Sequence, residues 1–440
     1  MVYWLIMFMN DTENIKEKIS KNAIVTAIAL AFFGLTTFIY NVLIGRIYGA
    51  EVLGLANTAI SSVFFIGIFV AFFASPSGKI VAEFFGREDN ESANYLMGFS
   101  FLFTILTGLI SIIILWIIRN YFIATFNLTN TIFLWILILI PLRGLFDVFR
   151  QMYYGTFRVG LYLKVLIISS IVFFIVLMFF YFMLLPLLLP FILMYLVFSL
   201  ISIYIFKGNF NLKASRKIKR GVQKYAFSYA FIAIIGNLAD MGKSNFSVML
   251  SAMFLSATQV GYFSAANSLM RVLNYIPAIL PYALFPVISY EFGKKNIDRI
   301  KRALNRIMRV WAVTLGFIVG LSLIYSQIFL YLFFGAEYLT AVLPLIILLI
   351  GFYFQSIIIP LISTLSGTKY IHISSLTGLL GFMVSTIAFI FLIPSYGIVG
   401  TALGIAIGNL IMSIVPFYFS RKFFDFKFRN FFYPFVKFVV

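Results

Sequence analysis

The chain has 440 residues, of which 62% are hydrophobic and 11% charged, and its mean hydropathy is +1.05. A soluble domain of this length needs far more polar surface, so the composition excludes a soluble globular protein. The net charge of +19 suits either nucleic acid or a membrane surface, and the absence of cysteine excludes disulfides, cysteine-ligated metals and thiol catalysis.

Apolar runs of about 20 residues, the length that crosses about 30 Å of hydrocarbon, recur along the whole chain. A helix satisfies its own backbone polar groups within such a run, as a span through lipid requires. We therefore predict an all-α polytopic membrane protein with about twelve transmembrane helices. The predicted spans are 22–44, 52–74, 95–118, 131–149, 163–184, 187–206, 225–250, 260–288, 310–333, 341–365, 373–393 and 398–419.

The basic residues are distributed unevenly between the two sides of this layout. With a cytoplasmic N-terminus, the inner segments, together with Lys164 at the inner end of the fifth span, hold 28 of the 33 lysines and arginines, whereas the outer loops hold Arg46 and Arg119. This is the asymmetry of the positive-inside rule, so it predicts a multi-pass cell membrane protein with both termini in the cytoplasm. The basic residues then face the headgroups of anionic membrane lipids, which argues against nucleic acid as a partner.

The longest inner connection, at 207–224, divides six predicted helices from six. The predicted organisation is a cytoplasmic leader at 1–21, a six-helix bundle at 22–206, the basic linker at 207–224, a second six-helix bundle at 225–419 and a tail at 420–440. The sequence leaves open whether residues 431–440 begin a thirteenth helix.

Short matches between the two halves support this division. Ala50, Gly54, Ala59 and Ser61 recur as Ala257, Gly261, Ala266 and Ser268 at a constant offset of 207, and Gly155–Thr156 recurs as Gly367–Thr368 at an offset of 212. Six helices per half give both halves the same orientation, which predicts two parallel repeats around a central cavity.

Ionised side chains deep within a span are costly and usually face a cavity or a partner. Away from the span ends these are Arg143, Asp147, Asp240, Lys243 and Arg271. Polar stripes at helical spacing accompany some of them: Asn237, Asp240, Ser244, Ser247 and Ser251 on the seventh span, and Ser264, Asn267, Arg271 and Asn274 on the eighth. Such stripes line wet cavities, but small polar residues also join helices to one another.

The candidate substrate-binding residues are Arg271, Asn267, Asn274, Lys243, Arg46 and Arg143, and Asp240 is the candidate for ion coupling. Alternatives remain open for several of them. Arg143 and Asp147 are four residues apart on one helix face and can neutralise each other, and Asp240 and Lys243 can pair in the same way. Arg46, in an outer loop, can instead face solvent or a lipid headgroup.

Enzymatic signatures are absent from the sequence. His372 is the only histidine, so no histidine-based metal cluster is expected. The run GNLADMGKS has five residues between its glycines where a phosphate-binding loop requires four. We therefore expect no catalytic residue, no metal and no cofactor, and a transporter in place of an enzyme.

Three longer segments carry a family resemblance. They are LIGRIYGAEVLGLANTAISS, ATQVGYFSAANSLMRVLNYIPAILPYALFPVIS and LIPSYGIVGTALGIAIGN. The chain resembles the polysaccharide transporter branch of the multidrug/oligosaccharidyl-lipid/polysaccharide exporter superfamily, the Wzx-like O-antigen flippases. The resemblance implies two six-helix bundles around a cavity that opens alternately to each side, with cationic residues lining it. It also implies that the substrate is an oligosaccharide attached through pyrophosphate to a polyprenyl lipid.

The expected function is therefore a flippase that moves this lipid-linked oligosaccharide from the inner to the outer leaflet for surface polysaccharide biosynthesis. Other glycan-assembly membrane proteins are candidate partners. One alternative is a multidrug or small-solute exporter of the same superfamily, although cationic drugs favour a cavity rich in carboxylates. A membrane-embedded glycan polymerase or ligase is the alternative from another class, and it requires a long outer loop that the predicted layout lacks.

Overall fold

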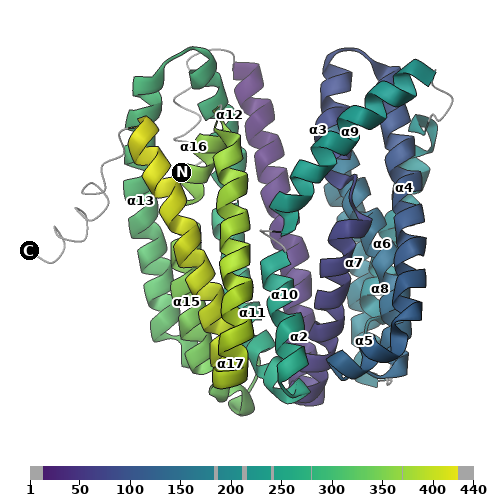
Figure 1. Ribbon diagram of the computed structural model, residues 1–440, viewed down its shortest axis with the longest axis vertical. Helices are drawn as coiled ribbons and strands as arrows, with labels where there is room; N and C mark the ends of the chain where they lie inside the picture. The colour runs from purple at the N-terminus through teal and green to yellow at the C-terminus, as the bar shows by residue number, and fades with distance from the viewer. Residues whose placement is uncertain are drawn as a thin grey trace, which may run out of the picture. The chain divides into compact units, whose positions relative to one another are not determined.

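The computed structural model describes residues 13–182, 187–210, 216–238, 242–278, 280–368 and 370–424. Over these ranges the secondary structure is helical, with no strand (Figure 1). Eight helical stretches among them are long and apolar enough to cross a membrane. The prediction of an all-α polytopic membrane protein is confirmed.

The first half of the chain contains α2 (Glu13–Val70), α3 (Ala74–Gly86), α4 (Asn90–Ile117), α5 (Arg119–Phe126), α6 (Asn130–Gly155), α7 (Val159–Phe182), α8 (Leu189–Phe206) and the short 3-10 helix η1 (Lys207–Asn209). The second half contains α9 (Arg216–Asn237), α10 (Lys243–Phe254), α11 (Ala257–Ala278), α12 (Leu280–Gly293), α13 (Ile297–Ile324), α14 (Ser326–Phe333), η3 (Ala336–Ala341), α15 (Val342–Ile357), α16 (Ile359–Ser366) and α17 (Ile371–Phe424).

Two of the long helices each consist of two helical parts joined at a glycine. The backbone leaves the helical conformation at Gly49 in α2 and at Gly397 in α17, where φ is 79° and 57°. Positive φ is available to glycine at little cost, whereas a side chain makes it strained. Both glycines lie in the breaks predicted between spans, at 45–51 and 394–397, so these two breaks are confirmed.

Other predicted spans correspond to shorter helices. The range 225–250 contains parts of α9 and α10, and 260–288 contains parts of α11 and α12. The basic segment 291–309, predicted as a loop, instead contains the first turns of α13. Ile300, Leu304 and Met308 are buried there at intervals of four residues, which gives the segment an apolar helical face despite its charge. The count of twelve spans stays a prediction.

The internal repeat is visible in the lengths and turns of the helices. Helices α4 and α13 both have 28 residues, and α5 and α14 both have eight. The turn residues Glu88 and Lys295, 207 positions apart, have φ of 60° and 59°. Asp89 and Asn296 then cap α4 and α13 by accepting a hydrogen bond from the backbone N–H three residues further on, at 3.0 and 3.3 Å. The offset of 207 seen in the sequence therefore relates equivalent structural elements.

Contacts divide the chain into two compact units. One is formed by residues up to Arg46 together with those from Tyr262 onward, and is called here the split unit; the other, Ile47–Gly261, is called the continuous unit. The first part of α2 thus packs with α12–α17, whereas α9 and α10 pack with α3–α8. The domain boundary that the sequence places at 207–224 stays a prediction.

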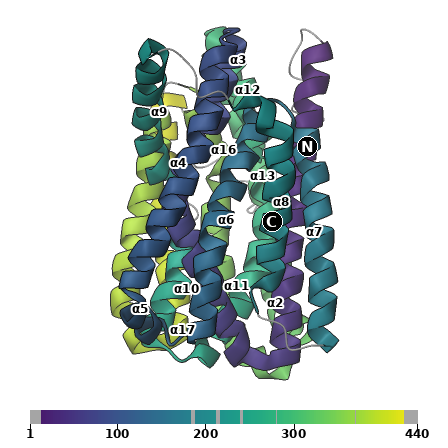
Figure 2. The same cartoon turned by 90° about the vertical axis from the view of Figure 1, so that its right-hand side faces the viewer.

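Aromatic packing fixes α9 on its neighbours in the continuous unit. Its buried face contains Val222, Ala226 and Ala230, and the ring of Phe227 lies 4.9 Å from that of Phe73 on α3. Figure 1 shows α9 crossing α3 and α4 obliquely. Helix α6 contacts α3, α4 and α8, and Figure 2 shows it running between α4 and α8. These contacts place α6 at the centre of this unit.

Candidate functional site

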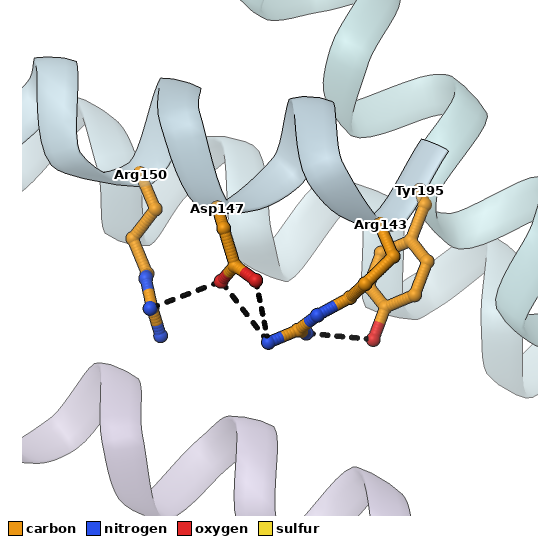
Figure 3. A network of polar contacts seen from close by, with 4 residues as sticks. All are labelled: Arg143, Asp147, Arg150 and Tyr195. Carbon is orange, nitrogen blue, oxygen red and sulfur yellow. Dashed lines mark hydrogen bonds and ion pairs between the residues drawn. The ribbon is translucent and has the colours of Figure 1, made fainter. Parts of the chain in front are cut away.

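A buried ionic network lies on α6 (Figure 3). Arg143 and Asp147 are one turn apart, and Nη2 of Arg143 lies 3.0 Å from the Asp147 carboxylate. Arg150 pairs with the same carboxylate, also at 3.0 Å. Nη1 of Arg143 donates to the Tyr195 hydroxyl on α8 at 3.0 Å. Positions 143, 147 and 150 share one face of a helix, so the ion pairs form within α6 and α8 completes the network.

The network is shielded from solvent. Arg143 is 2% exposed and Asp147 is 8% exposed. The guanidinium carbon of Arg143 lies 4.1 Å from the centroid of the Phe64 ring on α2, a cation–π distance. An unpaired charge within a span costs at least about 2.5–3.5 kcal/mol, and the carboxylate and hydroxyl offset that cost with charge-assisted hydrogen bonds. With two guanidinium groups and one carboxylate, the network keeps a net positive charge.

Arg150 is the member that sequence analysis missed. The fourth predicted span ends at residue 149, but α6 continues to Gly155 because its last turns are also packed. Tyr153 is fully buried there, and its hydroxyl lies 3.1 Å from the Ser202 hydroxyl on α8. The available signal was the spacing of the two arginines around Asp147, which places them on one helical face.

The predicted polar stripe of the eighth span lies on α11. Asn267 is 3% exposed, and its Oδ1 has no hydrogen-bond partner among the described residues. Asn274 donates from Nδ2 to the sulfur of Met270 at 3.2 Å. Arg271 lies on the same helix and is half-buried. Asn267, Arg271 and Asn274 therefore share one helix, as the sequence predicts, and their role in binding substrate stays a prediction.

Helix α11 is joined to α2 within the split unit. Asn41 on α2 donates from Nδ2 to the hydroxyl of Ser268 on α11 at 2.8 Å, and both side chains are buried. Closer to the end of α11, a side chain at Gly34 would overlap the Tyr275 ring, so the two helices are in close contact. A small polar residue beside the stripe thus joins two helices, which is the alternative role of such residues in membrane helices.

Lys243 is the first residue of α10 and is 4% exposed. The serines of the predicted stripe that follow it make hydrogen bonds to the backbone of their own helix. Ser247 donates to the carbonyl of Ser244, and Ser251 to the carbonyl of Ser247, both at 2.8 Å. Asp240, the ion-coupling candidate, lies outside the described residues. Lys243 belongs to the continuous unit and Arg271 to the split unit.

Arg46 holds the end of α14. Its Nε donates to the carbonyl of Phe333 at 2.8 Å and its Nη2 to that of Tyr331 at 3.2 Å, with a further hydrogen bond to the carbonyl of Leu332. The last carbonyls of a helix lack internal partners and carry partial negative charge, which a cation stabilises. These contacts favour a structural role, and a role for Arg46 in binding substrate stays a prediction.

No protein-family model matches the chain. Two curated relatives share part of it. The "Putative O-antigen transporter" of Shigella flexneri is 23% identical over 199 residues, 44% of this chain and 46% of that protein. The "Probable low-salt glycan biosynthesis flippase Agl15" of Haloferax volcanii is 22% identical over 221 residues, 49% of this chain and 47% of that protein. The matches thus span about half the length of each relative.

Solved structures resemble the chain over nearly its whole length. A multidrug resistance MATE family transporter of the MOP superfamily, in an inward-facing conformation, has a TM-score of 0.75 at 14% identity and covers 92% of this chain and 98% of its own. This chain has the MOP superfamily transporter fold. The lipid II flippase MurJ has a TM-score of 0.68 at 16% identity, covering 93% of this chain and 89% of its own. The resemblance indicated by the sequence motifs is thereby confirmed.

Proposed function

We propose that this MOP-fold protein is a flippase for an oligosaccharide linked through pyrophosphate to a polyprenyl lipid. It moves this substrate from the inner to the outer leaflet by alternating access, for surface polysaccharide biosynthesis. The observation that carries the proposal is a set of cationic side chains that are buried or half-buried in the described helices. Arg143 and Arg150 share one carboxylate, and Arg271 and Lys243 lie on α11 and α10. A pyrophosphate entering a low-dielectric region needs such groups to replace its water.

The printed names of the curated relatives agree with this substrate class, since one refers to O-antigen and the other to a glycan biosynthesis flippase. Membrane lipids and other glycan-assembly membrane proteins are the further partners that we propose. A multidrug exporter is the second candidate, because the MATE transporter shares the fold. Cationic drugs favour carboxylates, whereas the described network on α6 has a net positive charge.

Complementation tests the proposal. The gene is deleted in its host, surface glycan and lipid-linked oligosaccharide are quantified, and wild type, Arg271→Ala or Arg119→Ala is restored. Arg119 is a half-buried arginine of a predicted outer loop that donates to Asn130 at 2.8 Å, so it controls for the loss of one positive charge. A hydrogen bond to a charged group contributes about 1.5–3 kcal/mol, so we expect Arg271→Ala to lower glycan export about tenfold or more.

In the deletion strain the lipid-linked precursor should accumulate on the inner leaflet, and wild type and Arg119→Ala should both clear it. If surface glycan is unchanged in the deletion strain while a small solute accumulates in the cell, the exporter candidate replaces the flippase. If Arg271→Ala clears the precursor as wild type does, Arg271 has no role in binding the substrate.

The energy source that we propose is the membrane potential or ion exchange, with Asp240 as the coupling carboxylate. The measurement is flipping of a fluorescent lipid-linked oligosaccharide in proteoliposomes, with and without an imposed potential and ion gradient. We expect Asp240→Asn to remove the dependence on the gradient. A rate in wild type that is the same under all these conditions contradicts the coupling.

A further inference from the structure

Helices α4 and α13 occupy equivalent places in the two repeats, which allows their faces to be compared residue by residue. They have equal length, and a capping residue precedes each at the offset of 207. Tyr95 on α4 thus corresponds to Arg302 on α13, and Phe99 corresponds to Arg306.

In the first repeat this face is covered by α9. Tyr95 is 4% exposed, and its hydroxyl accepts a hydrogen bond from Nε2 of Gln223 at 2.8 Å. The rings of Phe99 and Phe103 both pack against Phe227, with centroids 6.3 and 5.8 Å away. Aromatic side chains here form a helix–helix contact.

In the second repeat the equivalent face is cationic. Arg302 and Arg306 take the places of the two aromatic residues, Arg309 lies one turn further, and all three are exposed. Arg299, on the same helix, is less exposed and lies 3.0 Å from the Glu291 carboxylate on α12. The segment 291–309 carries seven basic and two acidic residues, so the face attracts anions.

Beyond the arginines the exposed side of α13 becomes apolar. Val313, Phe317, Leu321 and Ile324 are exposed, with Phe317 at 67% and Ile324 at 74%. Ile117 on α4, the residue that corresponds to Ile324, is 76% exposed. Both repeats therefore turn this apolar part toward the hydrocarbon, and only the second repeat places a cluster of arginines at its edge.

We propose that this face of α13 is a binding site for an anionic phospholipid. The guanidinium groups of Arg302, Arg306 and Arg309 bind the headgroup phosphate, and an acyl chain lies along Val313 and Phe317. The sequence of charged and then apolar groups along one helix matches the order of groups in such a lipid. Arginine suits phosphate because its guanidinium donates several hydrogen bonds in a fixed geometry.

The chain's own C-terminal residues are a poorer occupant for this face. The range 425–440 contains three basic residues and one acidic residue, so its net charge has the same sign as the arginines. Like charges repel, whereas an anionic lipid supplies the opposite charge. The site is independent of the transported substrate, because it concerns the lipids that surround the protein.

The test measures lipid binding to the purified full chain in detergent by native mass spectrometry. Phosphatidylglycerol is the anionic probe and phosphatidylcholine the zwitterionic one. The triple variant is Arg302→Gln, Arg306→Gln and Arg309→Gln. We expect it to weaken phosphatidylglycerol binding at least about tenfold, since each basic side chain beside an anionic surface contributes a factor of about five. Wild type should bind phosphatidylcholine more weakly than phosphatidylglycerol.

The matched control removes three exposed basic charges from the continuous unit: Lys207→Gln, Arg220→Gln and Lys224→Gln. It should change phosphatidylglycerol binding by less than about twofold. An equal loss in the two triple variants would mean that net charge alone governs binding, and would overturn the site. Equal binding of both lipids by wild type, or displacement of phosphatidylglycerol by an equal concentration of inorganic phosphate, also overturns it.

A second measurement distinguishes lipid from another part of the chain. Because the protein has no cysteine, Arg306→Cys provides a single thiol for labelling with a maleimide. We expect rapid labelling in detergent and at least about fivefold slower labelling after phosphatidylglycerol is added, with no effect of phosphatidylcholine. A thiol that is unreactive without any added lipid shows that the chain itself covers this face, which contradicts the proposal.

Discussion

Asp147 forms ion pairs with two arginines, Arg143 and Arg150. The pair with Arg143 is the more buried of the two, since that side chain is 2% exposed, whereas the side chain of Arg150 is 16% exposed. Removing one partner of a buried pair leaves an uncompensated charge, which is more costly than removing both. The energetic role of the network thus depends on the carboxylate being present.

Asp147→Ala should therefore destabilise the protein by about 3–5 kcal/mol, the usual cost of breaking a buried ion pair. Replacing both partners, as Arg143→Met with Asp147→Leu, should cost less than the sum of the two single changes, because residues in one network are coupled by about 0.5–3 kcal/mol. Thermal unfolding in a fixed detergent measures Asp147→Ala, the double variant and its two single changes, Arg143→Met and Asp147→Leu. Additive losses would show that the pair is not coupled.

A pair with the same spacing on the surface gives the control. Arg87 and Glu83 are also four residues apart and form an ion pair on α3, but the side chain of Arg87 is 67% exposed. Exposed pairs contribute about 0–1 kcal/mol because water solvates both charges. Arg87→Ala should hence lower the melting temperature far less than Asp147→Ala.

Two helix segments meet through a contact that is reciprocal between the repeats. A Cβ at Gly54 would overlap the carbonyl oxygen of Ala257, and a Cβ at Gly261 would overlap the carbonyl oxygen of Ala50. Gly54 thus faces Ala257, four residues before Gly261, and Gly261 faces the alanine four residues before Gly54. This exchange is the pattern of an interface with two-fold symmetry. Small residues spaced by four allow the backbones of membrane helices to approach closely. The sequence matches at an offset of 207 therefore mark a physical contact.

Gly54→Ala and Gly261→Ala should each destabilise the protein, by about 1–3 kcal/mol, because the neighbouring atom is backbone and cannot move aside. Reciprocity predicts effects of similar size in the two variants. Gly320→Ala on α13 is the control, since nothing lies within 4 Å of its added Cβ. In a helix interior that change should stabilise by about 1 kcal/mol. Melting temperatures that are unchanged for both Gly54→Ala and Gly261→Ala contradict the close contact.

The organisation of the whole molecule combines duplication with the exchange of segments between units. The first part of α2 and the α9–α10 segment precede equivalent breaks in the two repeats, at Gly49 and at 255–256. The first part of α2 packs in the split unit, which contains most of the second repeat. The α9–α10 segment packs in the continuous unit, which contains most of the first repeat. The prediction of six spans in each of two parallel repeats puts both termini on the same side of the membrane, and the distribution of basic residues predicts that this side is the cytoplasm.

Cysteine labelling in intact cells tests this topology, since the natural chain has no thiol to remove. Thr340, predicted on the outside, and Asn90, predicted on the inside, are both exposed. We expect a membrane-impermeant maleimide to label Thr340→Cys in intact cells and Asn90→Cys only after lysis. The opposite pattern would reverse the orientation, and labelling of both in sealed cells would contradict the layout.

Local properties of the chain were enough to predict its class, its repeat and the position of several breaks. Hydropathy and charge act on each span as it enters lipid, so the all-α membrane fold and the breaks at Gly49 and Gly397 follow from short stretches of sequence. The conformations of the turns at Glu88 and Lys295 are also local, and the two turns lie at the offset of 207 that the sequence matches share.

The surroundings of each candidate residue depend instead on contacts between distant parts of the chain. Arg143 gains Tyr195 from a position 52 residues away, and Arg46 reaches the carbonyl of Phe333 across 287 residues. Sequence spacing places Asp147 beside Arg143 because both lie on one helix, but it contains no information on which other helix approaches. Tertiary packing therefore assigned Arg46 to a helix end, brought Tyr195 to Arg143 and left the arginines of α13 exposed.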